Sequence, residues 1–197
     1  MTRSVAVLAL LMLALSSACS GSSSPPAPLR VTVAAGGLTD EVATAVPAGP
    51  ERVLTVAHVL AGARSVHVGS RPARVLHVDP RLDLAVLEVR GLDAPRLRYA
   101  QADGVAKVHV LRSGRPRTIA VRVRRRVTAA LKDPRSDHTD VRPALELAAP
   151  VLPGDSGAPV TDNRGRIVGI IFARGLGESG TAWAVDVSKA ATFVRAL

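Results

Sequence analysis

Aromatic side chains are scarce in this 197-residue chain, since one Trp, one Tyr and two Phe make up only 2% of it. Because 47% of the residues are nonetheless hydrophobic, Val, Ala and Leu must fill most of any core. Acidic residues are also in the minority, with 16 against 26 Lys and Arg, for a formal net charge of +10. The length suits one compact unit or two small lobes that share an interface.

Cysteine is almost absent, because Cys19 is the only one, and this excludes a disulfide within one chain. The residues before it have the pattern of an export signal. Arg3 is a positive charge, residues 5–15 are an unbroken apolar run, and small residues follow at 16–18. We interpret residues 1–18 as a secretory signal peptide, since the apolar run is too short for a transmembrane helix.

A lone cysteine at this junction resembles the lipobox of bacterial lipoproteins, in which the cysteine is lipidated and becomes the new amino terminus. That family favours Leu three places before the cysteine, where this chain has Ser16, so an incidental cysteine beside an ordinary cleavage site stays an alternative. Residues 19–28, rich in Gly, Ser and Pro, are expected to form a flexible tether. We predict an exported protein, held on the outer face of the bacterial cytoplasmic membrane through a lipid anchor on Cys19, or secreted without it.

From residue 29 onward, short β-rich segments follow one another, separated by turn residues. The expected strands are 29–33, 41–46, 52–56, 65–68, 73–78, 84–89, 107–111, 118–127, 144–147, 159–160, 167–173 and 181–185. Residues 187–197 predict a helix capped by Ser188, and the polar residues 132–142 predict an exposed loop. About a dozen short strands predict an all-β protein made of barrels or a sandwich.

One stretch, residues 153–160, places a serine between two glycines in the order Pro-Gly-Asp-Ser-Gly-Ala-Pro-Val. Gly154 and Gly157 permit backbone conformations that side chains forbid, so Ser156 can be presented on a tight turn. Such a turn can aim successive backbone N–H groups at one point, where they would stabilise an oxyanion. A serine becomes a nucleophile only with a base beside it.

A histidine and an acid precede the serine in the chain. His58 follows an apolar strand segment, and Asp83 lies between Leu82 and Leu84, where a partly buried carboxylate needs a hydrogen-bond donor. The order His, Asp, Ser is that of chymotrypsin, whereas subtilisins and α/β-hydrolases use other orders. A lipase-type nucleophile elbow would also need glycine where this chain has Ala158.

On these motifs the chain resembles the trypsin-like serine peptidases of the chymotrypsin fold, and within them bacterial HtrA-like proteases without a PDZ domain. Residues 55–58 (Thr-Val-Ala-His) are similar to the family's Thr-Ala-Ala-His, residues 83–85 to its Asp-Leu-Ala, and residues 154–159 to its Gly-Asp-Ser-Gly-Gly-Pro. The resemblance implies that residues 29–197 form one peptidase domain. It would consist of two six-stranded antiparallel β-barrels, divided near 100–115, with a C-terminal helix.

The resemblance also implies the role of each residue in peptide-bond hydrolysis through an acyl-enzyme. Ser156 is the nucleophile, His58 the general base and acid, and Asp83 the group that orients the histidine. The N–H groups of Gly154 and Ser156 would form the oxyanion hole. No metal or organic cofactor is implied, and the substrate would be a protein or peptide.

The specificity pocket is expected to be lined by Pro150, Ile171, Phe172 and Ala173. No acid stands six places before the serine, where trypsin-like members carry one, so we expect a preference for small or aliphatic residues before the cut. Ile171 occupies a position where the family often has a polar residue. A catalytically latent protease-fold protein, serving as a binding or scaffold protein at the cell envelope, is the alternative to an active endopeptidase.

A basic run at residues 112–126 contains seven arginines and no acid. A nucleic-acid surface is disfavoured, because stacking aromatics are absent there and the protein is predicted to be exported. Attraction to anionic lipid headgroups or cell-wall polymers and a simple solvated strand face are the two interpretations that stay open. The oligomeric state is not predicted by the sequence.

Overall fold

The computed structural model describes residues 27–36, 39–132, 139–175, 180–190 and 192–193. The predicted signal peptide and Cys19 lie outside these residues. Among the described residues, no helix is long and apolar enough to cross a membrane.

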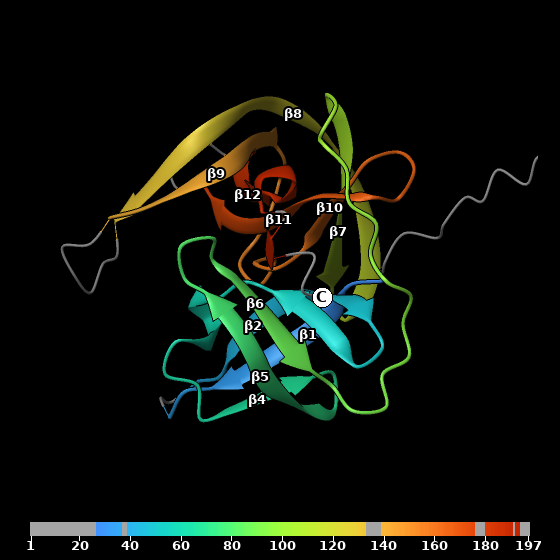
Figure 1. Cartoon of the computed structure of the whole chain (residues 1–197), viewed down its shortest axis with the longest axis vertical. Coiled ribbons are helices and arrows are strands. Elements are labelled where there is room, and N and C mark those ends of the chain that lie inside the picture. Colours follow the sequence, from blue (N-terminus) through green and yellow to red (C-terminus); the bar gives the residue numbers. More distant parts are fainter. Residues whose placement is uncertain (1–26, 37–38, 133–138, 176–179, 191, 194–197) are drawn as a thin grey trace, which may run out of the picture.

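Two closed barrels of six antiparallel strands make up the described chain, which confirms the predicted all-β fold (Figure 1). The first barrel has the strand order β1-β2-β3-β6-β5-β4, and the second has the order β10-β11-β12-β9-β8-β7. The strands of the first are β1 (Leu29–Ala34), β2 (Glu41–Gly49), β3 (Arg52–Thr55), β4 (Ser65–Val68), β5 (Arg71–Asp79) and β6 (Leu84–Glu88). Those of the second are β7 (Val105–Arg112), β8 (Arg115–Lys132), β9 (Thr139–Ala148), β10 (Pro159–Thr161), β11 (Ile167–Arg174) and β12 (Thr181–Asp186).

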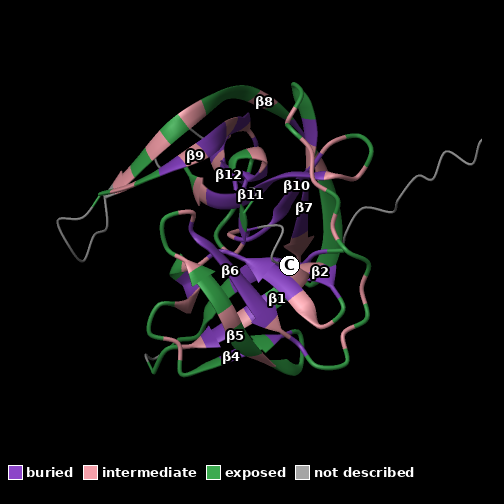
Figure 2. Cartoon of the chain, in the orientation of Figure 1, coloured by how far each residue is buried: buried purple, intermediate pink, exposed green. Residues whose placement is uncertain are grey.

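The core is divided unequally between the barrels. One cluster of buried residues contains only side chains of the second barrel and its loops. The other fills the first barrel and also includes Ala144, Ile167, Ile170, Phe172 and Val185 from the second. In Figure 2 buried residues form the inner part of both barrels and the region where they meet. The second barrel therefore supplies part of the surface on which the first one packs.

The hairpin of β8 and β9 is longer than the sequence pattern predicts. Strand β8 has 18 residues and β9 has 10, and their pairing continues to Lys132 and Thr139. The prediction of an exposed loop over residues 132–142 is therefore wrong for Lys132, which belongs to β8, and for Thr139–Arg142, which belong to β9 and include a buried arginine. Residues 133–138 lie outside the described residues. The cause is an inverted pattern, because Val141 faces solvent while Arg142 points inward.

The end of the chain differs in part from the predicted helix. A 3-10 helix, η2, spans Val187–Lys189, and its N-cap is Asp186, which accepts a hydrogen bond from the Ser188 N–H at 3.0 Å. Ser188 is thus the donor and not the cap. Thr192 and Phe193 are helical, and residues 194–197 lie outside the described residues, so the C-terminal helix stays a prediction.

Candidate active site

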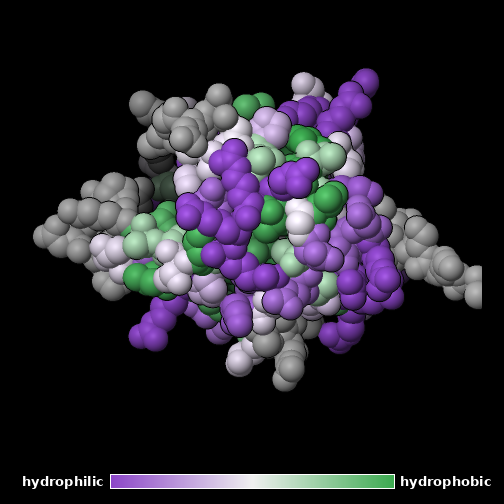
Figure 3. Space-filling model, turned by 90° about the horizontal axis from the view of Figure 1, so that it is seen from above, coloured by the Kyte–Doolittle hydropathy of each residue, from purple (hydrophilic) through white to green (hydrophobic). Residues whose placement is uncertain are grey.

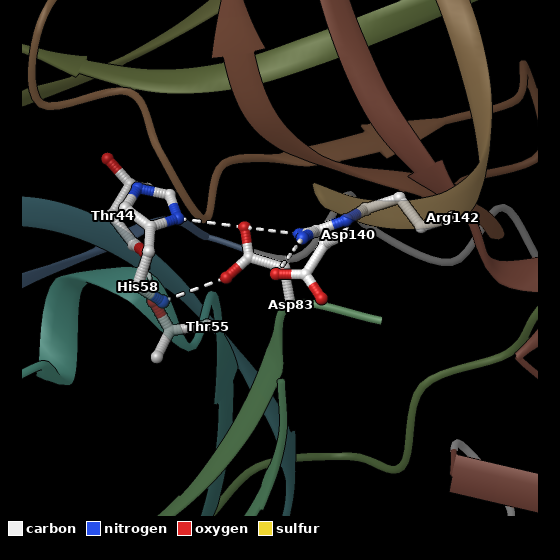
Figure 4. A network of polar contacts seen from close by, with 6 residues as sticks. All are labelled: Thr44, Thr55, His58, Asp83, Asp140 and Arg142. Atoms are coloured by element: carbon white, nitrogen blue, oxygen red, sulfur yellow. Dashed lines mark hydrogen bonds and ion pairs between the residues drawn. The ribbon is translucent and has the colours of Figure 1, made fainter. Parts of the chain in front are cut away.

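His58 is placed by the end of β3 and by a short 3-10 helix, η1 (His58–Leu60). The hydroxyl of Thr55, the last residue of β3, donates to the Thr44 carbonyl on β2 at 2.8 Å, which fixes the exit of the strand. Two groups of His58 then meet one carboxylate: its backbone N–H donates to Asp83 Oδ1 and its Nδ1 lies 2.8 Å from Oδ2 (Figure 4).

Asp83 occupies a turn immediately before β6. Its φ of +57° is left-handed, a region that Asp tolerates better than most residues. Backbone bonds hold this conformation, since Asp83 N–H donates to Pro80 O at 3.2 Å and Asp83 O accepts from Ala57 N–H at 3.1 Å. The turn therefore aims the carboxylate at His58 and keeps Asp83 buried.

This pairing selects one tautomer of the imidazole. A carboxylate only accepts, so Nδ1 must carry the proton, and the lone pair of a neutral ring is then on Nε2. The His58 side chain is 43% exposed while that of Asp83 is 7% exposed. The arrangement thus offers a base whose far nitrogen is accessible and whose near nitrogen is held by a buried anion.

Ser156 lies on the loop between β9 and β10, and this loop is bonded to the first barrel. Thr44 N–H donates to Ser156 O at 2.7 Å, and the Thr44 hydroxyl donates to Gly154 O at 2.8 Å. Thr44 also accepts from Thr55, three residues before His58. The structure therefore brings the serine turn and the histidine to the same strand, β2.

Gly157 is required by this close approach. Its φ is +88°, and a Cβ there would overlap the Thr44 carbonyl and lie 2.6 Å from the Thr55 hydroxyl. Its N–H donates to Ile171 O on β11 at 2.7 Å, which fixes the turn from the other side. Only glycine fits a backbone enclosed in this way.

Two amides of the turn are available as donors. Asp155 N–H donates to Leu152 O and Ala158 N–H to Asp155 O, whereas the N–H groups of Gly154 and Ser156 have no backbone acceptor among the described residues. Gly154 has a φ of +91°, which a non-glycine residue adopts only with strain. These are the two N–H groups that the sequence predicts as the oxyanion hole.

Asp155 is buried beneath the turn and is paired with Arg112 at the end of β7. Arg112 Nη2 donates to Asp155 Oδ2 at 2.7 Å, and Nη1 donates to Oδ1, which makes the pair bidentate. Oδ2 also accepts from Leu152 N–H at 2.7 Å. These bonds raise the pKa of Arg112 above its usual value, and they tether the turn to β7.

Arg142 on β9 is a site residue that the sequence pattern does not reveal. Its side chain is 6% exposed, and Nη1 lies 2.9 Å from Asp83 Oδ2, the oxygen that also receives His58 (Figure 4). The guanidinium carbon lies 5.3 Å from the centre of the Phe172 ring. A cation therefore touches the carboxylate that holds the histidine.

The predicted specificity residues differ in how far they are exposed. Ile171 is 1% exposed in the core of the second barrel, and its N–H and C=O bond to Ala158 and Gly157. Its backbone therefore supports the turn around Ser156. Phe172 is buried beside Arg142, Ala173 is half-buried and Pro150 is exposed. The pocket and its preference stay predictions.

The basic run lies mostly on β8, and several of its arginines are paired with acids. Arg124 and Arg125 contact Glu146 on β9, and Arg126 contacts Asp186 at 3.3 Å. Seen from above, the described surface is mixed, with many hydrophilic residues and some hydrophobic ones between them (Figure 3). These contacts favour the interpretation as a solvated strand face.

The remaining described histidines do not join the site. His109 is buried in the second barrel between the hydroxyls of Thr118 and Thr161, at 3.1 and 2.8 Å. Burial, assisted by Lys107, lowers the pKa of His109, so it is a neutral core residue. His67 and His77 lie on β4 and β5, and His138 lies outside the described residues.

Comparison with known protein families gives a clear match. The family model described as the trypsin-like peptidase domain matches residues 43–170. Serine protease Rv3671c of Mycobacterium tuberculosis is 31% identical over 152 residues, which cover 72% of this chain and 38% of that protein. A probable periplasmic serine endoprotease, DegP-like, of Pseudomonas fluorescens is 29% identical over 147 residues, covering 70% and 31%. The chain thus spans less than two fifths of the length of these curated relatives.

Solved structures agree with the fold. The active form of the Rv3671c protease from M. tuberculosis matches with a TM-score of 0.74 at 26% identity, over 85% of this chain and 78% of that one. The HtrA-type protease AlgW with a tripeptide has a TM-score of 0.71 at 21% identity, over 88% and 60%, and this likeness shows the fold alone.

Proposed function

Because the chain belongs to the trypsin-like peptidase family, we propose that it is a serine endopeptidase whose triad is His58, Asp83 and Ser156. The observation that carries this proposal is the double contact of Asp83 with His58, through the backbone N–H and through Nδ1, each at 2.8 Å. It supports a histidine with one tautomer and one orientation, which is what a general base needs.

The proposed reaction has two steps. Ser156 Oγ attacks the scissile carbonyl while its proton moves to His58 Nε2, and the resulting oxyanion accepts from the N–H groups of Gly154 and Ser156. His58 then gives that proton to the leaving amine, and an ester of Ser156 remains. Water, deprotonated by the same nitrogen, attacks the ester. His58 then returns the proton to Ser156 Oγ as the acyl–oxygen bond breaks, and the acid product leaves.

The buried pair of Asp155 and Arg112 supports a turn that is formed without a separate activating group. Asp155 is 2% exposed, and its carboxylate oxygens accept from Leu152 N–H and from Arg112 within the chain. A buried carboxylate needs such partners. We expect the oxyanion donors to be in place in the resting protein.

The test is labelling of the purified chain with a fluorophosphonate probe, beside Ser156→Ala and His58→Ala. Labelling of the wild type that is lost in both variants supports the proposal and justifies a peptide-library search for the residue preferred before the cut. A folded wild type that does not label contradicts an active enzyme and leaves the latent binding protein.

Export and lipidation are a separate part of the proposal. The apolar run before Cys19 and the tether after it support an anchor on the outer face of the membrane, and a relative named as periplasmic is consistent with export. Radiolabelled palmitate should enter the wild-type protein in cells and not Cys19→Ser. Incorporation into neither protein would contradict the lipid anchor and leave a secreted form.

A further inference from the structure

Arg142 places a permanent positive charge against the acid of the proposed triad. Its Nη1 lies 2.9 Å from Asp83 Oδ2, and the same oxygen lies 2.8 Å from His58 Nδ1. In Figure 4 the imidazole, the carboxylate and the guanidinium follow one another in a row. Asp83 is thus shared between a group that changes its charge during catalysis and one that does not.

Among the described residues, the other acid that this charge contacts, Asp140, lies farther away than Asp83. Arg142 Nη2 lies 3.7 Å from Asp140 Oδ2, and its Nε has no hydrogen-bond partner among the described residues. Its guanidinium carbon lies over the Phe172 ring. A guanidinium that is 6% exposed is costly to bury unless a carboxylate balances it. The 2.9 Å contact with Asp83 is therefore its main compensation.

Among the described residues, the charged side chains that contact Asp83 or Arg142 come from three elements. His58 comes from η1, Asp83 from the turn before β6, and Arg142 and Asp140 from β9. Strands β2 and β3 contribute the neutral hydroxyls of Thr44 and Thr55, and β11 contributes the apolar ring of Phe172. Of these groups, Arg142 is the one that places a permanent positive charge in contact with Asp83.

On the basis of the proposed function, we propose that Arg142 is a positioning residue, which orients Asp83 and weakens the attraction of this carboxylate for a protonated His58. A charged imidazole and Arg142 would be two cations on one carboxylate oxygen. Like charges disfavour each other at this range, so the positive histidine forms less readily with Arg142 present. The proposed base then stays neutral, and the enzyme active, at lower pH than with a neutral residue at this position.

The test compares Arg142→Gln, which is neutral but can still donate to Asp83, with Arg142→Lys, which keeps the charge. The acid limb of the rate of fluorophosphonate labelling against pH should move up by about one pH unit in Arg142→Gln. In Arg142→Lys it should stay near the wild-type position. Arg125→Gln removes an equal charge from a side chain that is 69% exposed and paired with Glu146, and should leave the limb unchanged.

A second readout does not depend on turnover. The pH at which the His58 imidazole resonance changes in NMR, assigned with His58→Ala, should rise in Arg142→Gln and not in Arg125→Gln. If the wild type does not label, the proposed function fails, and this resonance alone decides the inference about Arg142. A lower active fraction with both readouts at the wild-type pH would mean that Arg142 is structural, and would overturn the proposal.

Discussion

The two halves of the site each contain a buried carboxylate with an arginine, and the two pairs differ in what else the carboxylate contacts. Asp155 has all of its named partners in the second barrel, namely Arg112 in a bidentate pair and the Leu152 N–H. Asp83 is shared across the two barrels, between His58 and Arg142. One carboxylate thus holds a turn, and the other is coupled to a group that titrates.

This difference can be tested most strongly at the acids themselves. In Asp83→Asn the amide can donate to His58 Nδ1 and select the wrong tautomer, so the rate of fluorophosphonate labelling should fall by about 10⁴-fold. In Asp155→Asn the side-chain oxygen can still accept from Leu152 N–H. The labelling rate should fall by only roughly tenfold, because only some of the charged hydrogen bonds are lost. Equal losses in the two variants would contradict the division of roles.

The close contact between Gly157 and Thr44, which joins the serine turn to the first barrel, should also be sensitive to substitution. Gly157→Ala would push a Cβ into the Thr44 carbonyl, at a φ of +88°, so the free energy of unfolding should fall by about 4 kcal/mol. Gly62→Ala, also at positive φ but with nothing within 4 Å, should cost only about 1 kcal/mol. Urea denaturation followed by circular dichroism measures the stability of both variants. Similar losses would mean that the contact between Gly157 and Thr44 is not tightly packed.

Replacement of Arg112 should lower the stability of the protein more than it changes the pH dependence of labelling. Arg112→Met leaves Asp155 buried without its cation, and the expected loss is about 3 kcal/mol in the free energy of unfolding. The double variant with Asp155→Asn should recover part of this loss, because no charge then remains unpaired. The acid limb of labelling should not move, in contrast to Arg142→Gln. A shifted limb would show that the two pairs are coupled.

The sequence predicts the half of the site that lies in short local motifs. His58, Asp83 and the turn around Ser156 each stand in a motif of a few residues, and the β-rich segments between turn residues predict the positions of all twelve strands. These features depend on local sequence, which is why they can be recognised without coordinates.

The sequence does not predict either arginine partner. Arg112 and Asp155 are 43 residues apart, and Asp83 and Arg142 come from different barrels, so only the closed sheets bring them together. At Arg142 the binary pattern is misleading, because a charged residue points inward beside the exposed Val141. The register of β8 and β9 places it, and register is a property of the pairing rather than of one strand.

The smallest expected effect concerns a group outside both pairs, His109, which provides a baseline for every pH experiment on the site. Its pKa is lowered by burial, so the unfolded chain, with an ordinary value near 6.5, binds a proton before the folded one does. The free energy of unfolding should therefore decrease as the pH falls below about 6.5 and toward the lowered value.

The comparison of wild type with His109→Gln isolates this contribution, because glutamine can still bond to the hydroxyls of Thr118 and Thr161 and does not titrate. The variant should lose less stability than the wild type between pH 7 and pH 5 in urea denaturation. An equal loss in both would assign the pH dependence to other groups. The acid limb of labelling should be the same in both proteins, since His109 contacts neither Asp83 nor Asp155 in the described structure. A shift of that limb in His109→Gln would mean that the limb reports folding and not the ionisation of His58.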